Sequence, residues 1–409
     1  MKSMNRIGVV DLFAGCGGLT EGFESHGGYK TVAAVEWERY PCETLINRMY
    51  KKWKYKEAAN QVLQFDIQRT AELINGWNDT VYGTHDGLSK TVDKYGNVDI
   101  VIGGPPCQAY SIAGRIRDKD GMQFDYRNNL FESYLKTVEA LQMPRIIVFE
   151  NVPGILSAKP GGISIVERIS KAFKKLGYII SNDLRNNAVF NMVDYGIPQN
   201  RKRVIIIGLN ENHFGNKCAA VLADLYEKLH NDKNNYKRKY VGDVISSMDT
   251  FYPLNYKNNN SNKKFSHYPK NGKLLNSIPR FHNKRDISIF RMLAEDIKSG
   301  KKKYLKTDAL KALYTSKTGK ISSVHKYYVL RNVEPSNTIP AHLYKDGLRH
   351  IHPDPKQARS ITVREAARLQ GFDDNYEFIG PMGAQYKMIG NAVPPNFGLT
   401  MAQIFHNLF

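Results

Sequence analysis

Short apolar runs recur along the first half of the chain, and each ends close to Gly, Pro, Asp or Asn. Six such runs stand at 7–13 (IGVVDLF), 31–37 (TVAAVEW), 62–65 (VLQF), 98–104 (VDIVIGG), 145–151 (RIIVFEN) and 203–209 (RVIIIGL). Short runs rich in Val and Ile are typical of strands buried on both faces. Stretches with helical periodicity lie between them, such as 127–142 and 163–177. This alternation predicts an α/β fold with a doubly wound, mostly parallel sheet.

The alternation stops near residue 210, where the chain becomes rich in Lys, Asn and Tyr. The segment LNYKNNNSNKK (254–264) has the composition of an exposed loop. A helical pattern returns at 360–372, where Thr362 and Glu365 have the spacing of a capping box, and a final helix is expected over 395–408. We therefore predict an α/β domain over 1–209, a smaller irregular domain over 210–325, and a segment over 326–409.

The charge of the chain is concentrated in one part of it. Lys and Arg total 59 against 39 Asp and Glu, a formal charge of +20. Residues 251–330 alone hold 18 Lys and Arg against 4 Asp and Glu, interleaved with aromatic residues. A solvated lysine-rich surface would explain such a run, but cations mixed with aromatic rings also suit a nucleic-acid surface. A polyanionic partner is therefore expected.

Other broad classes of protein fit the sequence poorly. No apolar run is long enough to cross a bilayer, and the N-terminal segment lacks the apolar stretch of a signal peptide. The four cysteines are scattered without metal-ligand spacing. We expect no metal site, no membrane partner, and a reducing cytoplasmic location.

The first two runs end in residues that suit a nucleotide-like ligand. The turn AGCGG after the first run frees backbone N–H groups at a helix start, although its glycine spacing is not that of dinucleotide-binding proteins. Glu36 can accept hydrogen bonds from ribose hydroxyls, and Trp37 can pack against an adenine. Asp66 and Ile67 can supply an acceptor and an apolar face to the same base. A tight turn, a surface Glu and a core Trp would explain these residues equally well.

Reactive side chains follow three further runs. GGPPCQAYS (103–111) holds Cys107 after two prolines that fix a rigid turn. Glu150 ends the run at 145–151, and Arg201 and Arg203 alternate at the start of the run at 203–209. A buried cysteine is the ordinary alternative for Cys107 alone. It explains poorly a thiol, an acid and two guanidiniums that all lie near strand ends of one sheet.

These segments, in this order, resemble the motif set of the cytosine-C5 DNA methyltransferase family of bacterial and phage restriction-modification systems. The matching segments are DLFAGCGGL, EW, DI, GGPPCQAYS, RNNLF (127–131), ENV, DYGIPQNRKRVIIIG (194–208), RSITVREAARLQGF (359–372) and QYKMIGNAVPP (385–395). The resemblance implies a Rossmann-like methyltransferase sheet over 1–209, a target-recognition domain over 210–325, and a segment over 326–409 that completes the catalytic domain and hinge.

The resemblance also implies the chemistry. Cys107 would add to C6 of a flipped cytosine, Glu150 would hold or protonate N3, and Asn151 would hold Glu150 and its loop. Arg201 and Arg203 would orient the base and stabilise charge near O2. The substrate would further contact Pro106, Gln108, Ser111 and Arg127, within a closing loop over 108–129.

The expected cofactor is S-adenosyl-L-methionine. The resemblance assigns its contacts to sixteen residues: Phe13, Ala14, Gly15, Cys16, Gly17, Gly18, Leu19, Glu36, Trp37, Asp66, Ile67, Pro105, Leu130, Asn391, Ala392 and Val393.

Double-stranded DNA is the expected partner of a monomeric enzyme that acts at the nucleoid, with a separate cognate restriction endonuclease. A tRNA cytosine-C5 methyltransferase of the same fold is an alternative, but such enzymes lack a large variable domain. Unrelated RNA cytosine methyltransferases carry a second cysteine where this chain has ENV. A catalytically inactive DNA-binding module is the other alternative, and the intact set of reactive residues disfavours it. A nicotinamide dehydrogenase is disfavoured by the glycine spacing.

Overall fold

The computed structural model describes residues 6–106, 130–254, 265–269, 274–321, 327–345 and 347–409. The chain forms two compact units. Unit 1 comprises residues 1–195, 202–237 and 392–409, and unit 2 comprises 196–201 and 238–391. The expected loop at 108–129 lies outside the described residues, as does the expected loop at 254–264 except for its first residue.

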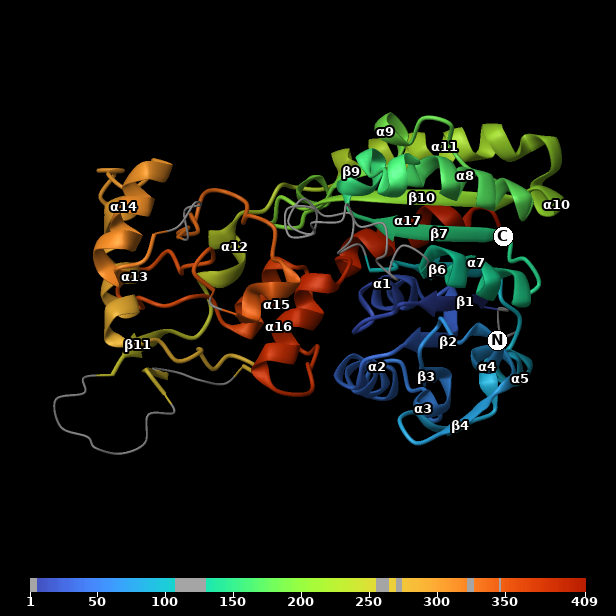
Figure 1. The fold of residues 1–409 in the computed structure, drawn as a ribbon, viewed down its shortest axis with the longest axis horizontal. Helices are drawn as coiled ribbons and strands as arrows, with labels where there is room; N and C mark the ends of the chain where they lie inside the picture. The colour runs from blue at the N-terminus through green and yellow to red at the C-terminus, as the bar shows by residue number, and fades with distance from the viewer. Residues whose placement is uncertain (1–5, 107–129, 255–264, 270–273, 322–326, 346) are drawn as a thin grey trace. The chain divides into compact units, whose positions relative to one another are not determined.

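The core of unit 1 is an eight-stranded sheet (Figure 1). Its order is β3-β2-β1-β6-β7-β10-β8, with β9 also paired to β10. The strands β3, β2, β1, β6 and β7 run parallel, whereas β10 runs antiparallel to β7, β8 and β9. The bounds are β1 (Ile7–Leu12), β2 (Tyr29–Glu36), β3 (Val62–Gln64), β6 (Ile100–Gly103), β7 (Ile146–Asn151), β8 (Tyr178–Ile179), β9 (Val189–Asn191) and β10 (Lys202–Asn210).

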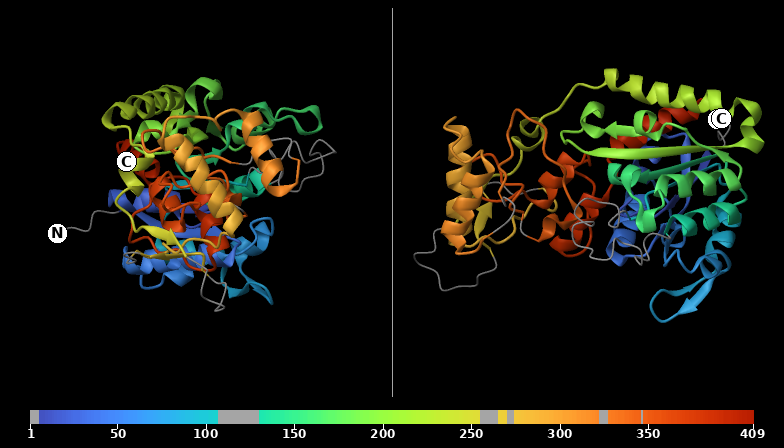
Figure 2. Two further views of the ribbon diagram at one scale, coloured as in Figure 1. Left: turned by 90° about the vertical axis from the view of Figure 1, so that its left-hand side faces the viewer. Right: turned by 45° about the horizontal axis from the view of Figure 1, so that its top comes forward.

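The predicted mostly parallel sheet is confirmed, and the six apolar runs of the sequence are its main strands. Every residue of β1 and β7 is buried, because helices cover both faces of the sheet (Figures 1 and 2). The antiparallel direction of β10 has a consequence for function. It brings the first residues of β10 to the edge where the parallel strands have their carboxyl ends.

The helices of unit 1 alternate with these strands. Their bounds are α1 (Gly18–His26), α2 (Arg39–Lys51), α3 (Ala58–Gln61), α4 (Thr70–Asn75), α5 (Gly87–Tyr95), α7 (Leu130–Ala140), α8 (Ile165–Lys175), α9 (Leu184–Asn187), α10 (Glu211–Phe214), α11 (Cys218–Asp232) and α17 (Pro395–His406). The helices expected within 127–142, 163–177 and 395–408 are therefore present. In α8 the buried residues Ile165, Ile169 and Phe173 recur every four positions, so one stripe of the helix faces the sheet.

Helices α1 and α17 pack against each other although they lie far apart in sequence. A Cβ atom on Gly22 of α1 would lie 2.5 Å from the backbone carbon of Gly398 in α17. Two glycines are therefore needed for the two backbones to approach this closely. The hydroxyl of Tyr29 adds a hydrogen bond of 2.7 Å to the carbonyl of Ala402.

Between β3 and β6, the chain adds a small hairpin of β4 (Trp77–Asp79) and β5 (Gly83–His85), flanked by α4 and α5. This hairpin forms a two-stranded sheet separate from the main one. Together, α4, the hairpin and α5 fill most of the stretch 68–98.

Unit 2 holds α12 (Val241–Ile245), β11 (Phe251–Pro253), β12 (His267–Pro269), α13 (Lys284–Lys298), α14 (Thr307–Thr318), α15 (Val363–Leu369) and α16 (Met382–Asn391). Helices α13 and α14 pack around an apolar cluster that includes Phe290, Leu293, Leu313 and Tyr327. The predicted capping box is present at α15, where the side chains of Thr362 and Glu365 each bond the other's backbone N–H.

The compact units do not follow the sequence-based boundaries. Helix α11 belongs to unit 1 because the Tyr226 hydroxyl accepts a hydrogen bond from the N–H of Ile207 and donates one to the carbonyl of Ile205, both in β10. The residues of 326–391 group with those of 238–325. The functional division into 1–209, 210–325 and 326–409 stays a prediction.

Candidate active site

Most of the candidate residues of unit 1 lie at one edge of its sheet. Parallel strands place their carboxyl ends at the same edge, which is where ligands bind in doubly wound sheets. The turn after β1, the end of β2, the turn after β3, the Pro105–Pro106 turn after β6 and the end of β7 all lie there, as does the start of the antiparallel β10.

The glycine-rich turn after β1 is held open for a ligand. Phe13, Gly15 and Gly17 all have positive φ, at 59°, 56° and 84°. None of the residues that the structure describes lies within 4 Å of the position of a Cβ on Gly15, so they leave this backbone uncovered. A Cβ on Gly18 would lie 2.2 Å from the carbonyl oxygen of Val393. The structure thus brings together two of the predicted cofactor segments, 13–19 and 392–393.

Glu36 organises the base of this turn. Its carboxylate accepts hydrogen bonds from the backbone N–H groups of Gly15 at 2.9 Å and of Trp37 and Glu38 at 2.8 Å each. Burial raises the pKa of Glu36 to about 7, although these three donors favour the charged form. Trp37 beside it is 48% exposed, so its ring is available to a ligand.

Several other candidates lie in the walls around this site. Cys16, Leu19, Ile67, Leu130 and Val393 are each less than 9% exposed. Their side chains belong to the core of unit 1, and Ile67 in particular offers little free surface to a base. Burial raises the pKa of the Cys16 thiol to about 12, which keeps the thiol protonated. Ala14 is also buried, whereas Asp66 is half-buried.

The acid at the end of β7 pairs with an arginine of β10. The Nε atom of Arg203 lies 2.7 Å from Oε1 of Glu150, and both side chains are nearly buried. A Cβ atom on Gly104 would lie 2.6 Å from Oε2 of the same carboxylate. The carboxylate of Glu150 is therefore fixed between Arg203 and the backbone of Gly104.

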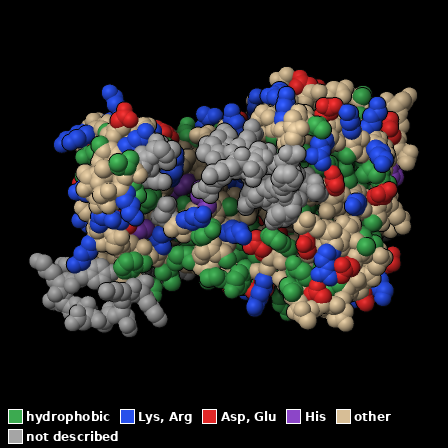
Figure 3. Space-filling view, viewed as in Figure 1, with side chains coloured by type: hydrophobic (Ala, Val, Ile, Leu, Met, Phe, Trp, Pro, Cys, Tyr) green, Lys and Arg blue, Asp and Glu red, His purple; other side chains and the backbone are tan. Residues whose placement is uncertain are grey.

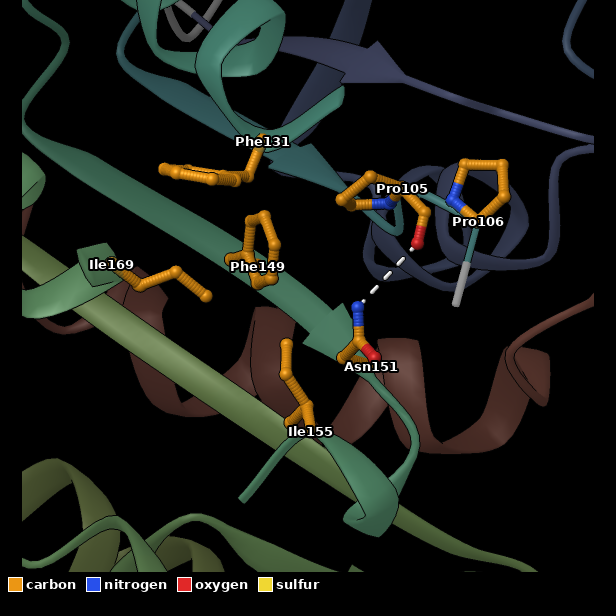
Figure 4. A pocket seen from close by; sticks show the side chains of 7 residues that line it. All are labelled: Pro105, Pro106, Phe131, Phe149, Asn151, Ile155 and Ile169. Carbon is orange, nitrogen blue, oxygen red and sulfur yellow. Dashed lines mark hydrogen bonds between the residues drawn. The ribbon is translucent and has the colours of Figure 1, made fainter. Parts of the chain in front are cut away.

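Asn151 contacts the turn that leads to Cys107. Its Nδ2 donates to the carbonyl of Pro105 at 3.5 Å, and its Oδ1 accepts from the N–H of Val152 at 3.0 Å. Pro105 and Pro106 also line a small apolar hollow with Asn151 and four other residues (Figure 4), which are Phe131, Phe149, Ile155 and Ile169. Cys107, Gln108, Ser111 and Arg127 themselves lie outside the described residues.

Arg201 and Arg203 belong to different compact units. Arg201 belongs to unit 2 and is fully buried there. Its guanidinium donates to the carbonyls of Ile339 at 3.1 Å and Gly390 at 2.9 Å. Asn391, another predicted cofactor residue, also belongs to unit 2 and is exposed at the end of α16.

One buried acid of this edge was not among the sequence-based candidates. Asp11 of β1 is 1% exposed, and its Oδ2 accepts a hydrogen bond of 2.6 Å from the hydroxyl of Thr20. Burial raises the pKa of Asp11 to about 7. A carboxylate within the apolar run IGVVDLF is the sequence signal that could have identified it.

Within the described ranges, no group of three or more His, Cys, Asp or Glu side chains has the arrangement of a metal site. None of the helices in the described part of the chain is long and apolar enough to cross a membrane.

Comparison with known proteins agrees with this geometry. The solved structures of a Dnmt2 methyltransferase from S. pombe and the EhMeth methyltransferase from Entamoeba histolytica have TM-scores of 0.55 and 0.52 to this chain. Each covers 98% or more of both chains, at 15% and 16% sequence identity, so they establish the fold alone. The fold is the Rossmann-like fold of S-adenosylmethionine-dependent methyltransferases.

The sequence comparisons define the family. A model described as C-5 cytosine-specific DNA methylase matches residues 7–405. The type II methyltransferase M.Bpa9945I of Bacillus paralicheniformis is 33% identical, over 95% of this chain and 96% of its own length. The type II methyltransferase M.NgoFVII of Neisseria gonorrhoeae is 30% identical, over 100% of this chain and 88% of its own. The chain belongs to the C-5 cytosine-specific DNA methylase family, and it is a DNA cytosine-C5 methyltransferase.

Proposed function

We propose that this chain transfers a methyl group from S-adenosyl-L-methionine to C5 of a cytosine flipped out of duplex DNA, through a covalent adduct of Cys107 at C6. The observation that carries this mechanism is the ion pair between Glu150 and Arg203. It lies at the edge of the sheet from which the Pro105–Pro106 turn leads to Cys107. An acid and a guanidinium held in fixed positions at the start of the nucleophile segment are what activation of a cytosine requires.

The reaction activates a carbon that is a poor nucleophile. The Cys107 thiolate adds to C6, so that the electrons of the C5–C6 double bond become available at C5. When bound, S-adenosylmethionine would supply the electrophilic methyl group for C5 and would leave as S-adenosylhomocysteine. Loss of the C5 proton to a base then restores the double bond and expels the thiolate, which returns the enzyme to its starting state.

The described residues near the end of β7 and the start of β10 would bind the base and position the nucleophile turn. Glu150 would hold or protonate N3 of the flipped base, and Arg203 would keep that carboxylate in place and face the developing charge near O2. Asn151 would hold the nucleophile turn through the carbonyl of Pro105. Arg201 would act on the base only if its guanidinium left the carbonyls of Ile339 and Gly390, so we propose that Arg201 mainly fixes the backbone of its own unit.

The residues at the edge of the sheet fit the cofactor. The backbone at Gly15, which the described residues leave uncovered, gives room for close approach, and Glu36 has about one acceptor site left for a ribose hydroxyl after accepting three N–H groups. The exposed ring of Trp37 and the carboxylate of Asp66 are available to the adenine. These four residues are our proposed core of the cofactor site.

Unit 2 carries the charge for a DNA backbone. Lys and Arg side chains gather over α13 and α14 on the face shown in Figure 3, and the loop between these helices exposes Lys301, Lys302, Lys303 and Lys306. Electrostatic attraction to phosphates depends on such charges and carries no base specificity. We propose that residues 210–325 contact duplex DNA, that the enzyme acts as a monomer at the nucleoid, and that a separate cognate endonuclease reads the same target.

The test uses the full chain and a duplex in which the target cytosine is replaced by 5-fluorocytosine. Bisulfite sequencing of DNA from cells that express the chain first gives the target. Because fluorine at C5 cannot leave as a proton does, wild type should accumulate a covalent complex that survives denaturation. Cys107→Ser should form no adduct and transfer no methyl groups while still binding DNA, because a hydroxyl is far less ionised than a thiol. Cys218→Ser, in α11, is the matched control and should behave as wild type. Methyl transfer by Cys107→Ser at a substantial rate would refute the mechanism.

A further inference from the structure

The hairpin of β4 and β5 is not part of the family motifs that the sequence contains, so its role must come from its contacts. A two-stranded hairpin is marginally stable by itself. Its strands pair only with each other in the described sheets. What holds the hairpin in place is therefore side-chain packing, and the packing is directed at a single turn of unit 1.

The hairpin extends a column of stacked rings that begins at Phe65, directly after β3. The rings of Phe65 and Trp77 stack with centroids 4.1 Å apart and an interplanar angle of 24°. The ring of His85 stacks on Trp77 at 4.8 Å and 17°. Tyr82, at the tip of the hairpin, packs edge-on against Phe65 at 5.1 Å. Phe65 and Trp77 are 1% and 6% exposed, so this column is a small core of its own.

Arg69 forms a second connection between the turn after β3 and the hairpin. Its guanidinium lies 4.7 Å from the centroid of Phe65 and forms ion pairs with Glu72 and with Asp79 of β4. The carboxylate of Asp79 also accepts the N–H groups of Val81 and Tyr82, at 2.8 and 2.6 Å, and so shapes the hairpin turn.

The segment held by these two ties is Asp66–Ile67. Phe65 immediately precedes it and Arg69 follows two residues later. The carbonyl of Asp66 accepts the N–H of Arg69 at 3.0 Å, and the carbonyl of Ile67 accepts the hydroxyl of Thr70 at 2.9 Å. Asp66 thus lies between Phe65, which stacks on Trp77, and Arg69, which pairs with Asp79 of the hairpin.

His85 anchors the far end of the column. Its Nδ1 accepts the N–H of Gly87 at 2.9 Å, so the ring proton is on Nε2, which donates to the carbonyl of Asn60 at 3.4 Å. Asn60 lies in α3, just before β3. The hairpin is therefore connected to the main sheet both before and after the turn that carries Asp66.

We propose that the hairpin 77–85 positions Asp66 for the adenine of the methyl donor, with Trp77 as the main positioning residue. This inference rests on the proposed cofactor site. Trp77 would not touch the cofactor, so its loss should weaken cofactor binding and leave the chemical step unchanged. Because an aromatic stack is worth roughly two- to tenfold in an equilibrium constant, Trp77→Leu should raise the Kd for S-adenosylhomocysteine by about that factor.

The experiment measures binding of S-adenosylmethionine and S-adenosylhomocysteine to the full chain by titration calorimetry, and methyl transfer to duplex DNA under steady state. Trp77→Leu should raise both Kd values and the KM for S-adenosylmethionine, with kcat and the Kd for DNA unchanged. Trp77→Phe, which preserves a stack, should restore most of the affinity. Asn78→Ala is the matched control, because Asn78 accepts the hydroxyl of Thr84 within the same hairpin. This change removes one exposed hydrogen bond and leaves the stacked rings and the Arg69–Asp79 ion pair in place, so the variant should bind both ligands as wild type does.

The outcomes separate this inference from the proposed function. Wild type that binds neither ligand would overturn both. Wild-type binding with unchanged affinity in folded Trp77→Leu would overturn the positioning role alone. If Trp77→Leu does not fold, Asp79→Asn breaks the tie to Arg69 from a more exposed position. The same rise in Kd with unchanged kcat is expected there, and unchanged affinity in this variant also overturns the inference.

Discussion

Four histidines of unit 2 should make this unit unfold in weak acid. His267, His282, His350 and His352 are each 5% exposed or less. Burial is the largest cause that lowers their pKa values, to about 4 for His267, His350 and His352 and about 3 for His282. The positive charge of Arg359 adds to this effect at three of them.

Hydrogen bonds show why the neutral rings are required. Nε2 of His282 accepts the N–H of Ser360 at 3.2 Å, and Nδ1 of His352 accepts the N–H of Asp354 at 3.1 Å. A nitrogen that accepts an N–H cannot carry a proton of its own. Protonation of either ring must therefore break a buried hydrogen bond as well as bury a charge.

The sign of the pH dependence follows from these pKa values. In the unfolded chain each histidine titrates near 6.5, so below that pH the unfolded state binds more protons than the folded state. The stability is present above pH 6.5 and is lost as the pH falls toward 4. Between pH 7 and pH 5, each histidine should lower the free energy of unfolding of unit 2 by about 2 kcal/mol. Additivity of all four would give about 8 kcal/mol, which is comparable with the whole stability of a typical domain.

Unit 1 should respond in the opposite direction. The pKa values of Asp11 and Glu36 are raised to about 7, so the folded state holds protons that the unfolded state releases near pH 4. Their contribution is present at low pH and is lost as the pH rises toward 7. Acidification from pH 7 to pH 5 should therefore stabilise unit 1 while it destabilises unit 2.

Hydrogen exchange at pH 7 and pH 5, corrected for the intrinsic rate at each pH, can separate the two units. Peptides from α13 should lose protection at pH 5, and peptides from β1 should not. His282→Gln should shift the loss of α13 protection to lower pH. His213→Gln, at an exposed position of α10, is the control and should have no effect. Undiminished protection of α13 at pH 5 would show that these histidines do not govern the stability of unit 2.

Three further changes test the site. Gly104→Ala should displace the Glu150 carboxylate, because Oε2 of that carboxylate lies 2.6 Å from the position of the new Cβ. We expect kcat to fall roughly 100-fold with little change in Tm. Gly383→Ala is the control and should be as active as wild type, because the nearest described atom lies 3.9 Å from its new Cβ. Glu36→Ala should raise the Kd for S-adenosylmethionine about tenfold or more in calorimetry, and unchanged affinity would remove Glu36 from the cofactor site. Replacing Lys301–Lys303 by Gln should weaken binding to all duplexes alike and lower the salt slope by about one unit per lost phosphate contact; a change confined to the target duplex would contradict a backbone role.

The strands of the main sheet could be predicted from the sequence because the central strands are buried on both faces. Strands of that kind are nearly uniform in Val and Ile, so β1, β6 and β7 stand out from the segments around them. The direction of β10 could not be read in this way, because an apolar run has the same composition in either direction. Helix α11 was also missed, since its attachment to β10 depends on the hydroxyl of Tyr226.

The sequence predicted the site residues that stand at the ends of strands. It did not predict which of these residues contact one another. Glu150 and Arg203 were identified separately, but their ion pair requires the antiparallel pairing of β7 and β10. The two alternate arginines looked equivalent in sequence. In the structure they have different partners, since Arg203 pairs with Glu150 whereas Arg201 bonds to backbone carbonyls of unit 2. The column of stacked rings joins Phe65, after β3, to Trp77 of β4 and His85 of β5. No periodicity in the sequence predicts these contacts.

The close packing of α1 against α17 has a consequence for the order of folding during synthesis. Unit 2 consists almost entirely of residues 238–391, so all of it leaves the ribosome before α17 does. The first strands and α1 must wait with one apolar face uncovered until α17 emerges and Gly398 meets Gly22. We therefore expect unit 2 to reach its native state first and the cofactor turn at Gly18 to form last, which delays methyl transfer until α17 has been synthesised.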